Sequence, residues 1–110
     1  MHELKITQNV VATISKRAKG AKVQRVLLEI GKLSGIMPEA VRYCFDVCSQ
    51  GTVAEGAILA IQEIPGLARC SKCGAEIPLD KPLGVCEECG SVELVMIRGQ
   101  DLKVKEIEMG

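Results

Sequence analysis

Two Cys-x-x-Cys-Gly motifs constrain this chain more than any other feature of its sequence. The first occupies residues 70–74 and the second residues 86–90. Two cysteines at this spacing turn their sulfurs to one side of a loop, and the glycine supplies the positive φ that lets the backbone curl toward sulfur. Two facing loops make a closed, tetrahedral site of four sulfurs, which is typical of structural zinc. The sequence therefore predicts a zinc ribbon, and its expected ligands are Cys70, Cys73, Cys86 and Cys89.

Two alternatives share these four cysteines, namely a rubredoxin-like iron site and a pair of disulfides. Cys44 and Cys48 lie outside the motifs. Free thiols beside a thiolate metal site favour a reducing compartment. The chain also shows no signal-peptide pattern and no apolar run long enough to span a membrane. We therefore expect a cytoplasmic protein.

Composition limits both the size of the core and the class of partner. The chain has 110 residues, of which 47% are hydrophobic and only 2% aromatic, so Val, Ile, Leu and Ala must build the core. Lys plus Arg equals Asp plus Glu at 14 each. Residues 69–98 carry four cations against five anions. This balance argues against binding to nucleic acid or to an anionic membrane.

Hydrophobic periodicity and turn residues predict an α+β fold. We expect a small sheet of about three strands, covered on one face by two helices, with the four-cysteine zinc ribbon inserted before the last strand. This gives two expected domains, an α/β domain at 1–66 plus 100–110 and a zinc-ribbon domain at 67–99. The expected elements are a helix at 4–19, a strand at 23–33, a helix from Pro38 to Gly51, and strands at 57–64, 92–97 and 102–109. Pro65-Gly66 is expected to end the strand at 57–64 before the first motif.

Three apolar stripes define the expected core. Within the last of them, Cys44 and Cys48 share one helix face and are expected to pack as small hydrophobic residues. The stripes are Leu4, Thr7, Val11, Ile14 and Ala18, with Val10 at the margin; Val26, Leu28 and Ile30; and Val41, Cys44, Phe45 and Cys48.

The single histidine of the chain, His2, lies next to the terminal amine. The amine of Met1, the backbone nitrogens of His2 and Glu3 and the His2 imidazole can present their donors in one plane. A square-planar array of imidazole and amide nitrogens favours Ni(II) or Cu(II) over zinc. Because protons compete for these nitrogens, binding weakens as the pH falls. An isolated histidine is more often an ordinary surface or core residue, so spacing alone leaves both interpretations open.

Several segments in order carry a resemblance to a known family. They are Met1-His2-Glu3-Leu4, residues 30–35 before Pro38-Glu39, Gly51-Thr52, residues 56–59, and the paired cysteine motifs followed by Gly99. Together they resemble the HypA family, the hydrogenase maturation or nickel-insertion accessory proteins. The resemblance runs from Met1 to about Glu108, and the combination is far more specific than either metal motif alone.

The resemblance implies a nickel metallochaperone. It places Ni(II) at Met1, His2 and Glu3, and a structural Zn(II) at the four ribbon cysteines. The implied partners are a HypB-type nickel GTPase, the large subunit of [NiFe]-hydrogenase and, for some members, urease maturation proteins. Glu39 is expected to complement the dipole of its own helix in preference to binding nickel.

Other function classes have weaker support in the sequence. An enzyme needs a nucleophile, an acid–base pair or an open metal site, and the chain offers one histidine and no phosphate-binding loop. We therefore expect no catalysis. The main alternative is a zinc-ribbon module that recruits another macromolecule, which a basic or aromatic stripe would mark. A thiol redox protein is a second alternative, and tight stoichiometric zinc would argue against it.

Overall fold

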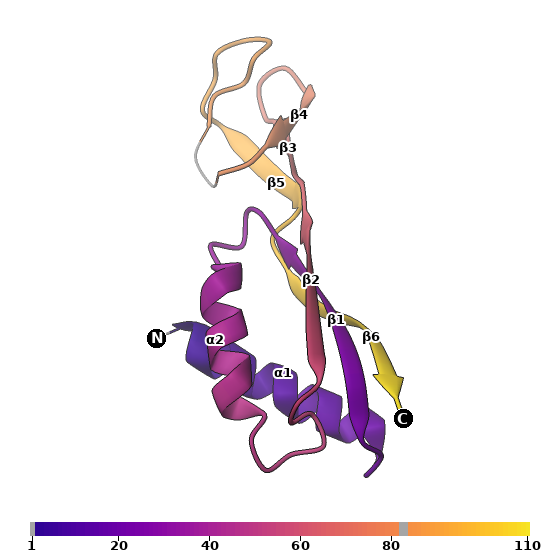
Figure 1. Ribbon diagram of the computed structural model, residues 1–110. Coiled ribbons are helices and arrows are strands. Elements are labelled where there is room, and N and C mark those ends of the chain that lie inside the picture. The colour runs from indigo at the N-terminus through magenta and orange to yellow at the C-terminus, as the bar shows by residue number, and fades with distance from the viewer. Residues whose placement is uncertain (1, 82–83) are drawn as a thin grey trace. The chain divides into compact units, whose positions relative to one another are not determined.

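The computed structural model describes residues 2–81 and 84–110 of the chain (Figure 1). Within these residues the strands form two three-stranded sheets, of order β2-β1-β6 and β4-β3-β5. The α+β class is therefore confirmed. The elements are α1 His2–Ala18, β1 Val23–Gly31, α2 Pro38–Cys48, β2 Ile58–Ile64, β3 Gly66–Cys70, β4 Glu76–Leu79, β5 Leu94–Arg98 and β6 Leu102–Met109.

The chain divides into two compact units. The first comprises Met1–Glu29, Ile36–Gln62 and Lys103–Gly110, and it contains both helices. The second comprises Ile30–Gly35 and Glu63–Leu102, and it contains the second sheet with both cysteine motifs. The functional assignment of a nickel-binding domain at 1–66 plus 100–110 and a zinc-ribbon domain at 67–99 stays a prediction.

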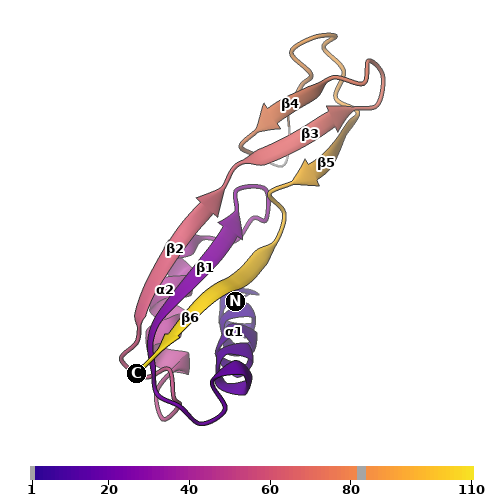
Figure 2. The same ribbon diagram turned by 90° about the vertical axis from the view of Figure 1, so that its right-hand side faces the viewer.

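The first sheet places β1 between β2 and β6. In Figure 2, β1 and β2 run in the same direction, β6 runs in the opposite direction, and both helices lie on one face of the sheet. The last strand therefore returns to this sheet after the ribbon, as the sequence predicted. Residues Val26, Leu28 and Ile30 of β1 are buried. This confirms the alternation expected for the strand at 23–33.

Helix α1 begins at His2, two residues earlier than predicted, and ends at Ala18. Lys19 and Gly20 follow with φ of 50° and 88°. Two successive residues in the left-handed region cannot continue the helix. Among the described residues, no helix is long and apolar enough to cross a membrane.

The buried stripe of α1 differs from the predicted stripe at two positions. Thr7, Ile14 and the rest of the stripe are buried, but Leu4 is 41% exposed and was wrongly placed in the core. Val10, predicted at the margin, is only 4% exposed. Leu4 lines a groove against α2. The first turn of the helix therefore packs on the neighbouring helix and leaves part of its apolar surface in solvent.

Helix α2 starts at Pro38, as predicted, and its last residue is Cys48. Val41 and Phe45 are buried, whereas Cys44 and Cys48 are only half-buried. The predicted stripe is therefore correct in direction but too wide. A helix that packs through one narrow line of side chains leaves the flanking positions partly exposed.

The second sheet corrects the sequence-based picture of the ribbon. Pro65-Gly66 ends the strand at 57–64 as predicted, because β2 ends at Ile64, but the sequence pattern predicts no strand at 66–70 or 76–79. Instead β3 begins at Gly66 and pairs antiparallel with β4 and β5. Proline fixes φ at a value compatible with extended backbone, so the chain continues into a new strand after it. Ala68 and Ile77 are buried between these strands.

Three glycines meet within the second unit. An added Cβ on Gly31 would lie 2.0 Å from the carbonyl oxygen of Gly99, and one on Gly99 would lie 2.7 Å from the Cα of Gly66. The backbone N–H of Leu33 donates to the Gly99 carbonyl at 2.7 Å. Leu33 is 5% exposed. The segment Ile30–Gly35 is therefore packed into the unit that carries the cysteine motifs.

Candidate metal centre

The two cysteine motifs fold into equivalent loops. In the first, the backbone N–H of Gly74 donates to the Cys70 carbonyl at 2.9 Å, and in the second that of Gly90 donates to the Cys86 carbonyl at 2.8 Å. Both glycines have positive φ, 77° and 76°. These are the glycine conformations that the motif spacing predicted. Each loop therefore turns its two sulfurs to one side.

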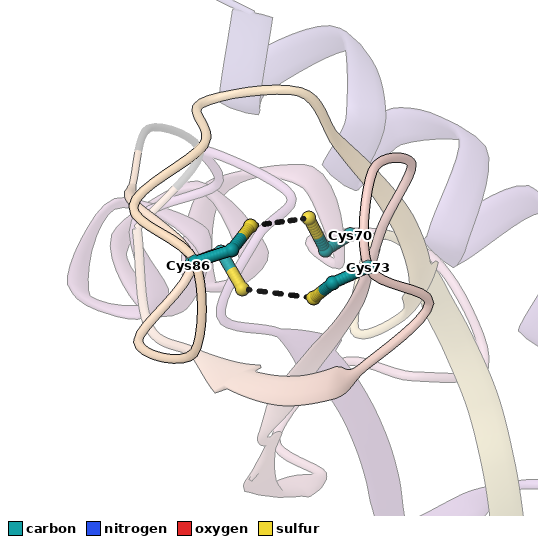
Figure 3. Close-up of side chains that lie close together, drawn as sticks. Cys70, Cys73 and Cys86 are labelled. Atoms are coloured by element: carbon teal, nitrogen blue, oxygen red, sulfur yellow. Dashed lines mark hydrogen bonds between the residues drawn. The ribbon is translucent and has the colours of Figure 1, made fainter.

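The four sulfurs form one cluster, shown in Figure 3. All four Sγ atoms lie within 4.8 Å of one another. The Sγ atoms of Cys70 and Cys89 are 3.5 Å apart, and those of Cys73 and Cys86 are 3.6 Å apart. A disulfide requires about 2.05 Å, so neither pair forms a disulfide. Four sulfurs at about 2.3 Å from a zinc ion would be separated by about 3.8 Å, and the cluster fits that tetrahedron.

The cluster is half enclosed by the ribbon. Cys70 and Cys86 are buried at 1% and 2% exposure, whereas Cys73 and Cys89 are exposed. The two buried cysteines belong to the small core of the ribbon, which Ala68 and Ile77 complete together with the partly buried Leu79 and Leu94. One cysteine of each motif is thus fixed by packing, which holds the pair of loops face to face.

The four thiols of the cluster influence one another's ionisation. The backbone N–H groups of Cys73 and Lys72 stabilise the Cys70 thiolate and, against burial, lower the pKa of Cys70 to about 6. The N–H of Ser91 acts to lower the pKa of Cys89, but hydrogen bonding to the Cys70 sulfur and burial raise that pKa to about 12. Without a cation, one thiolate therefore suppresses the ionisation of its neighbour. A divalent metal ion compensates several thiolates at once.

The N-terminal residues predicted to bind nickel are only partly described. Met1 and the side chain of His2 lie outside the described residues. Glu3 is half-buried in the first turn of α1, and its carbonyl accepts a hydrogen bond from the Thr7 hydroxyl at 2.6 Å. Its carboxylate Oε2 lies 3.5 Å from the backbone nitrogen of Met37. The N–H groups of a first helical turn lie outside the i to i−4 ladder, and Glu3 belongs to this first turn.

The remaining cysteines do not join a metal cluster. Among the described residues, the four ribbon cysteines are the only group of three or more potential ligands close enough to share an ion. Burial, and then the neighbouring Cys44, raise the pKa of the Cys48 thiol. A protonated, half-buried thiol is a weak ligand and nucleophile. This fits the expectation that both residues of the pair serve packing.

Sequence reasoning missed a groove of about 360 Å³ between the start of α1 and one side of α2. The signal was present, because four residues of α2 at three- and four-residue spacing form a second apolar stripe beside Val41 and Phe45. Tyr43 and Val47 are 72% and 50% exposed there. The groove is lined by Glu3, Leu4, Ala40, Tyr43, Cys44 and Val47.

Comparison with known proteins gives one consistent result. A family model described as "HypA: Hydrogenase/urease nickel incorporation, metallochaperone" matches residues 1–109. A hydrogenase maturation factor HypA from Nostoc punctiforme is 68% identical over 109 residues, which cover 99% of this chain and 96% of the relative. The corresponding protein from Geobacter sulfurreducens is 46% identical and is covered over 99% of both chains.

Two solved structures share the fold. The solution structure of the Ni metallochaperone HypA from Helicobacter pylori matches with a TM-score of 0.71 at 25% identity, covering 97% of this chain and 96% of that one. A second solution structure, of a HypA protein, matches with a TM-score of 0.69 at 26% identity and covers 99% and 96%. The chain therefore shares the overall fold of these two proteins.

Proposed function

This chain belongs to the HypA family of hydrogenase and urease nickel-incorporation metallochaperones, and we propose that it binds one Ni(II) at its N-terminus and delivers it to the large subunit of [NiFe]-hydrogenase. The observation that carries the proposal is the family match, which begins at residue 1. The segment Met1-His2-Glu3 therefore lies at the start of the matched region. The family is one of metal carriers, and we propose no catalytic activity for this member.

The proposed nickel site uses four nitrogens. They are the terminal amine of Met1, the backbone nitrogens of His2 and Glu3, and the imidazole of His2. Planar nitrogen donors suit Ni(II). A site at a chain terminus has few surrounding groups to lock it, so a docking partner can remodel it and take the ion. This combination of specific donors and weak enclosure suits a carrier, which must both hold and release its cargo.

The four ribbon cysteines are proposed as the ligands of a structural Zn(II). The sulfur spacing of 3.5–3.6 Å within the two closest pairs supports this. The ion would supply the positive charge that keeps all four sulfurs ionised. With four protein ligands no position is left for substrate, so this centre would hold the ribbon together. In this proposal, residues 1–66 plus 100–110 form the nickel-binding domain and residues 67–99 the zinc-ribbon domain.

The proposed partners follow from nickel delivery to hydrogenase. They are a HypB-type nickel GTPase, which would work with this protein before insertion, and the hydrogenase large subunit, which would receive the ion. The family description names urease as well as hydrogenase, so urease maturation proteins are further proposed partners. Each partner would approach the N-terminus, because the cargo is held there.

The proposal is tested by calorimetric titration of Ni(II) into tag-free, zinc-loaded protein. We expect one nickel per chain in the wild type. We also expect its loss in His2→Ala and in a variant with one extra N-terminal residue, which displaces the terminal amine. If all three proteins bind nickel alike, the terminus is not the site. A zinc-ribbon interaction module without nickel delivery would then be the better proposal.

A further inference from the structure

Helix α2 begins without a cap of its own. Its N-cap residue is Met37, which has extended backbone, with φ −91° and ψ 116°, and makes no side-chain capping bond. Met37 is followed by Pro38 at the first helical position, which contributes no N–H. The aligned peptide groups nevertheless place a partial positive charge at this end. The start of α2 therefore needs an acceptor from elsewhere in the chain.

The carboxylate of Glu3 provides that acceptor. Its Oε2 lies 3.5 Å from the backbone nitrogen of Met37, although Glu3 belongs to the first turn of α1. At this length the attraction between an anion and the helix N-terminus outweighs the hydrogen bond itself. The same residue is anchored through its backbone, because the fully buried Thr7 donates its hydroxyl to the Glu3 carbonyl at 2.6 Å.

We propose that the Glu3 carboxylate is a positioning group, which caps α2 and thereby fixes the first turn of α1, and that it is not a nickel ligand. This inference rests on the proposed nickel site at the terminus. With Glu3 held against α2, the backbone nitrogen of Glu3 samples fewer conformations in the metal-free protein. Less conformational entropy is then lost when Ni(II) binds.

The test compares Glu3→Gln with Glu39→Gln. Glu39 lies in the first turn of α2 itself and is exposed, so its loss removes a similar charge near α2 without releasing α1. Full-length, zinc-loaded proteins are titrated with Ni(II), and the visible absorption spectrum of the bound ion is recorded. Hydrogen exchange of the Met37 amide is measured in the nickel-free proteins.

We expect Glu3→Gln to bind nickel about 2- to 10-fold more weakly, the range that corresponds to loss of one charge at a helix N-terminus. The spectrum of bound nickel should be unchanged, and the Met37 amide should exchange faster. Glu39→Gln should bind nickel as the wild type does. The unchanged spectrum separates positioning from ligation, since loss of a ligand alters the absorption of the ion.

Three results would overturn the inference. A changed spectrum in Glu3→Gln would make the carboxylate a ligand. Equal nickel affinities of Glu3→Gln and wild type would rule out the positioning role. If Glu39→Gln lost as much nickel affinity as Glu3→Gln, the effect would come from the negative charge alone and not from the contact between Glu3 and α2. If the wild type and His2→Ala bind nickel alike, the proposed function fails instead. Exchange of the Met37 amide then still tests the cap independently.

Discussion

Replacing Gly31 by alanine is expected to destabilise the protein strongly, for a purely steric reason. The φ of Gly31 is not positive, so alanine fits its backbone conformation. The new Cβ, however, would lie 2.0 Å from the Gly99 oxygen, and real Cβ atoms essentially never approach other atoms within 3.0 Å. The two segments must therefore separate by about 1 Å.

The magnitude follows from what this separation breaks. The Leu33 N–H donates to the same Gly99 oxygen at 2.7 Å, and the Gly31 N–H donates to the Asp101 carbonyl at 2.8 Å. Loss or stretching of these bonds costs about 0.5–1.5 kcal/mol each, and steric strain in a packed site adds about 1–3 kcal/mol. We expect the free energy of unfolding to fall by about 2–6 kcal/mol. This lowers the urea midpoint by about 1–3 M.

Gly35→Ala is the matched control. Gly35 has φ 75°, and a Cβ there meets nothing within 4 Å. It should cost only the left-handed strain of about 1–2 kcal/mol. Both variants are unfolded in urea with zinc bound, and unfolding is followed by circular dichroism and by zinc release. The reasoning is refuted if Gly31→Ala is as stable as wild type or loses less than Gly35→Ala.

Three further experiments test the metal centre and the core. Cys73→Ser should abolish stoichiometric zinc in the purified protein, measured by elemental analysis, whereas Cys44→Ser should retain it, because Cys44 lies outside the sulfur cluster. Zinc-free protein should ionise one thiol with a midpoint near pH 6, measured by absorbance at 240 nm, because backbone N–H groups lower the pKa of Cys70 to about 6. Because folding lowers the pKa of Cys70 from the ordinary thiol value of 9.0, the Cys70 thiolate stabilises the zinc-free fold fully at a pH above 9.0. This contribution is lost as the pH falls through about 6. Ile14→Ala should lower the free energy of unfolding by about 2–5 kcal/mol, because Ile14 is fully buried. Leu4→Ala should lower it by about 1 kcal/mol or less, because Leu4 is 41% exposed.

Each of these predictions has an outcome that contradicts it. Full zinc in Cys73→Ser would show that the ion does not need all four sulfurs. A thiol midpoint near pH 9 in zinc-free protein would mean that the N–H groups of the first loop do not stabilise the Cys70 thiolate. Similar losses of stability in Ile14→Ala and Leu4→Ala would contradict the burial of one and the exposure of the other.

The Ile30–Gly35 segment shows how a family signature can serve structure. It precedes α2 in the chain, yet it is packed into the unit that carries the cysteine motifs. Gly31 there meets Gly99, and Leu33 bonds to the same residue. Glycine is needed at both contact points because two backbones approach closely. These residues therefore shape the unit that carries the cysteine motifs and need no direct role at either proposed metal site.

The zinc-ribbon cluster and the main layout were predictable from sequence because their causes are local. Two cysteines and a glycine at fixed spacing determine the shape of a loop wherever that loop lies. The alternation of Val26, Leu28 and Ile30 identifies a buried strand by its period of two, and the apolar final strand required a sheet to join. These inferences depend on neighbouring residues only.

Tertiary structure decided what depends on residues far apart in the chain. It left Leu4 partly exposed, because Leu4 lines the groove between α1 and α2. It also extended the chain after Pro65 into the strand β3, because β3 pairs with β4 and β5. It also brought Glu3 to Met37, 34 residues away. No periodicity encodes such contacts, since each arises from the packing of two elements whose mutual position the local pattern does not fix.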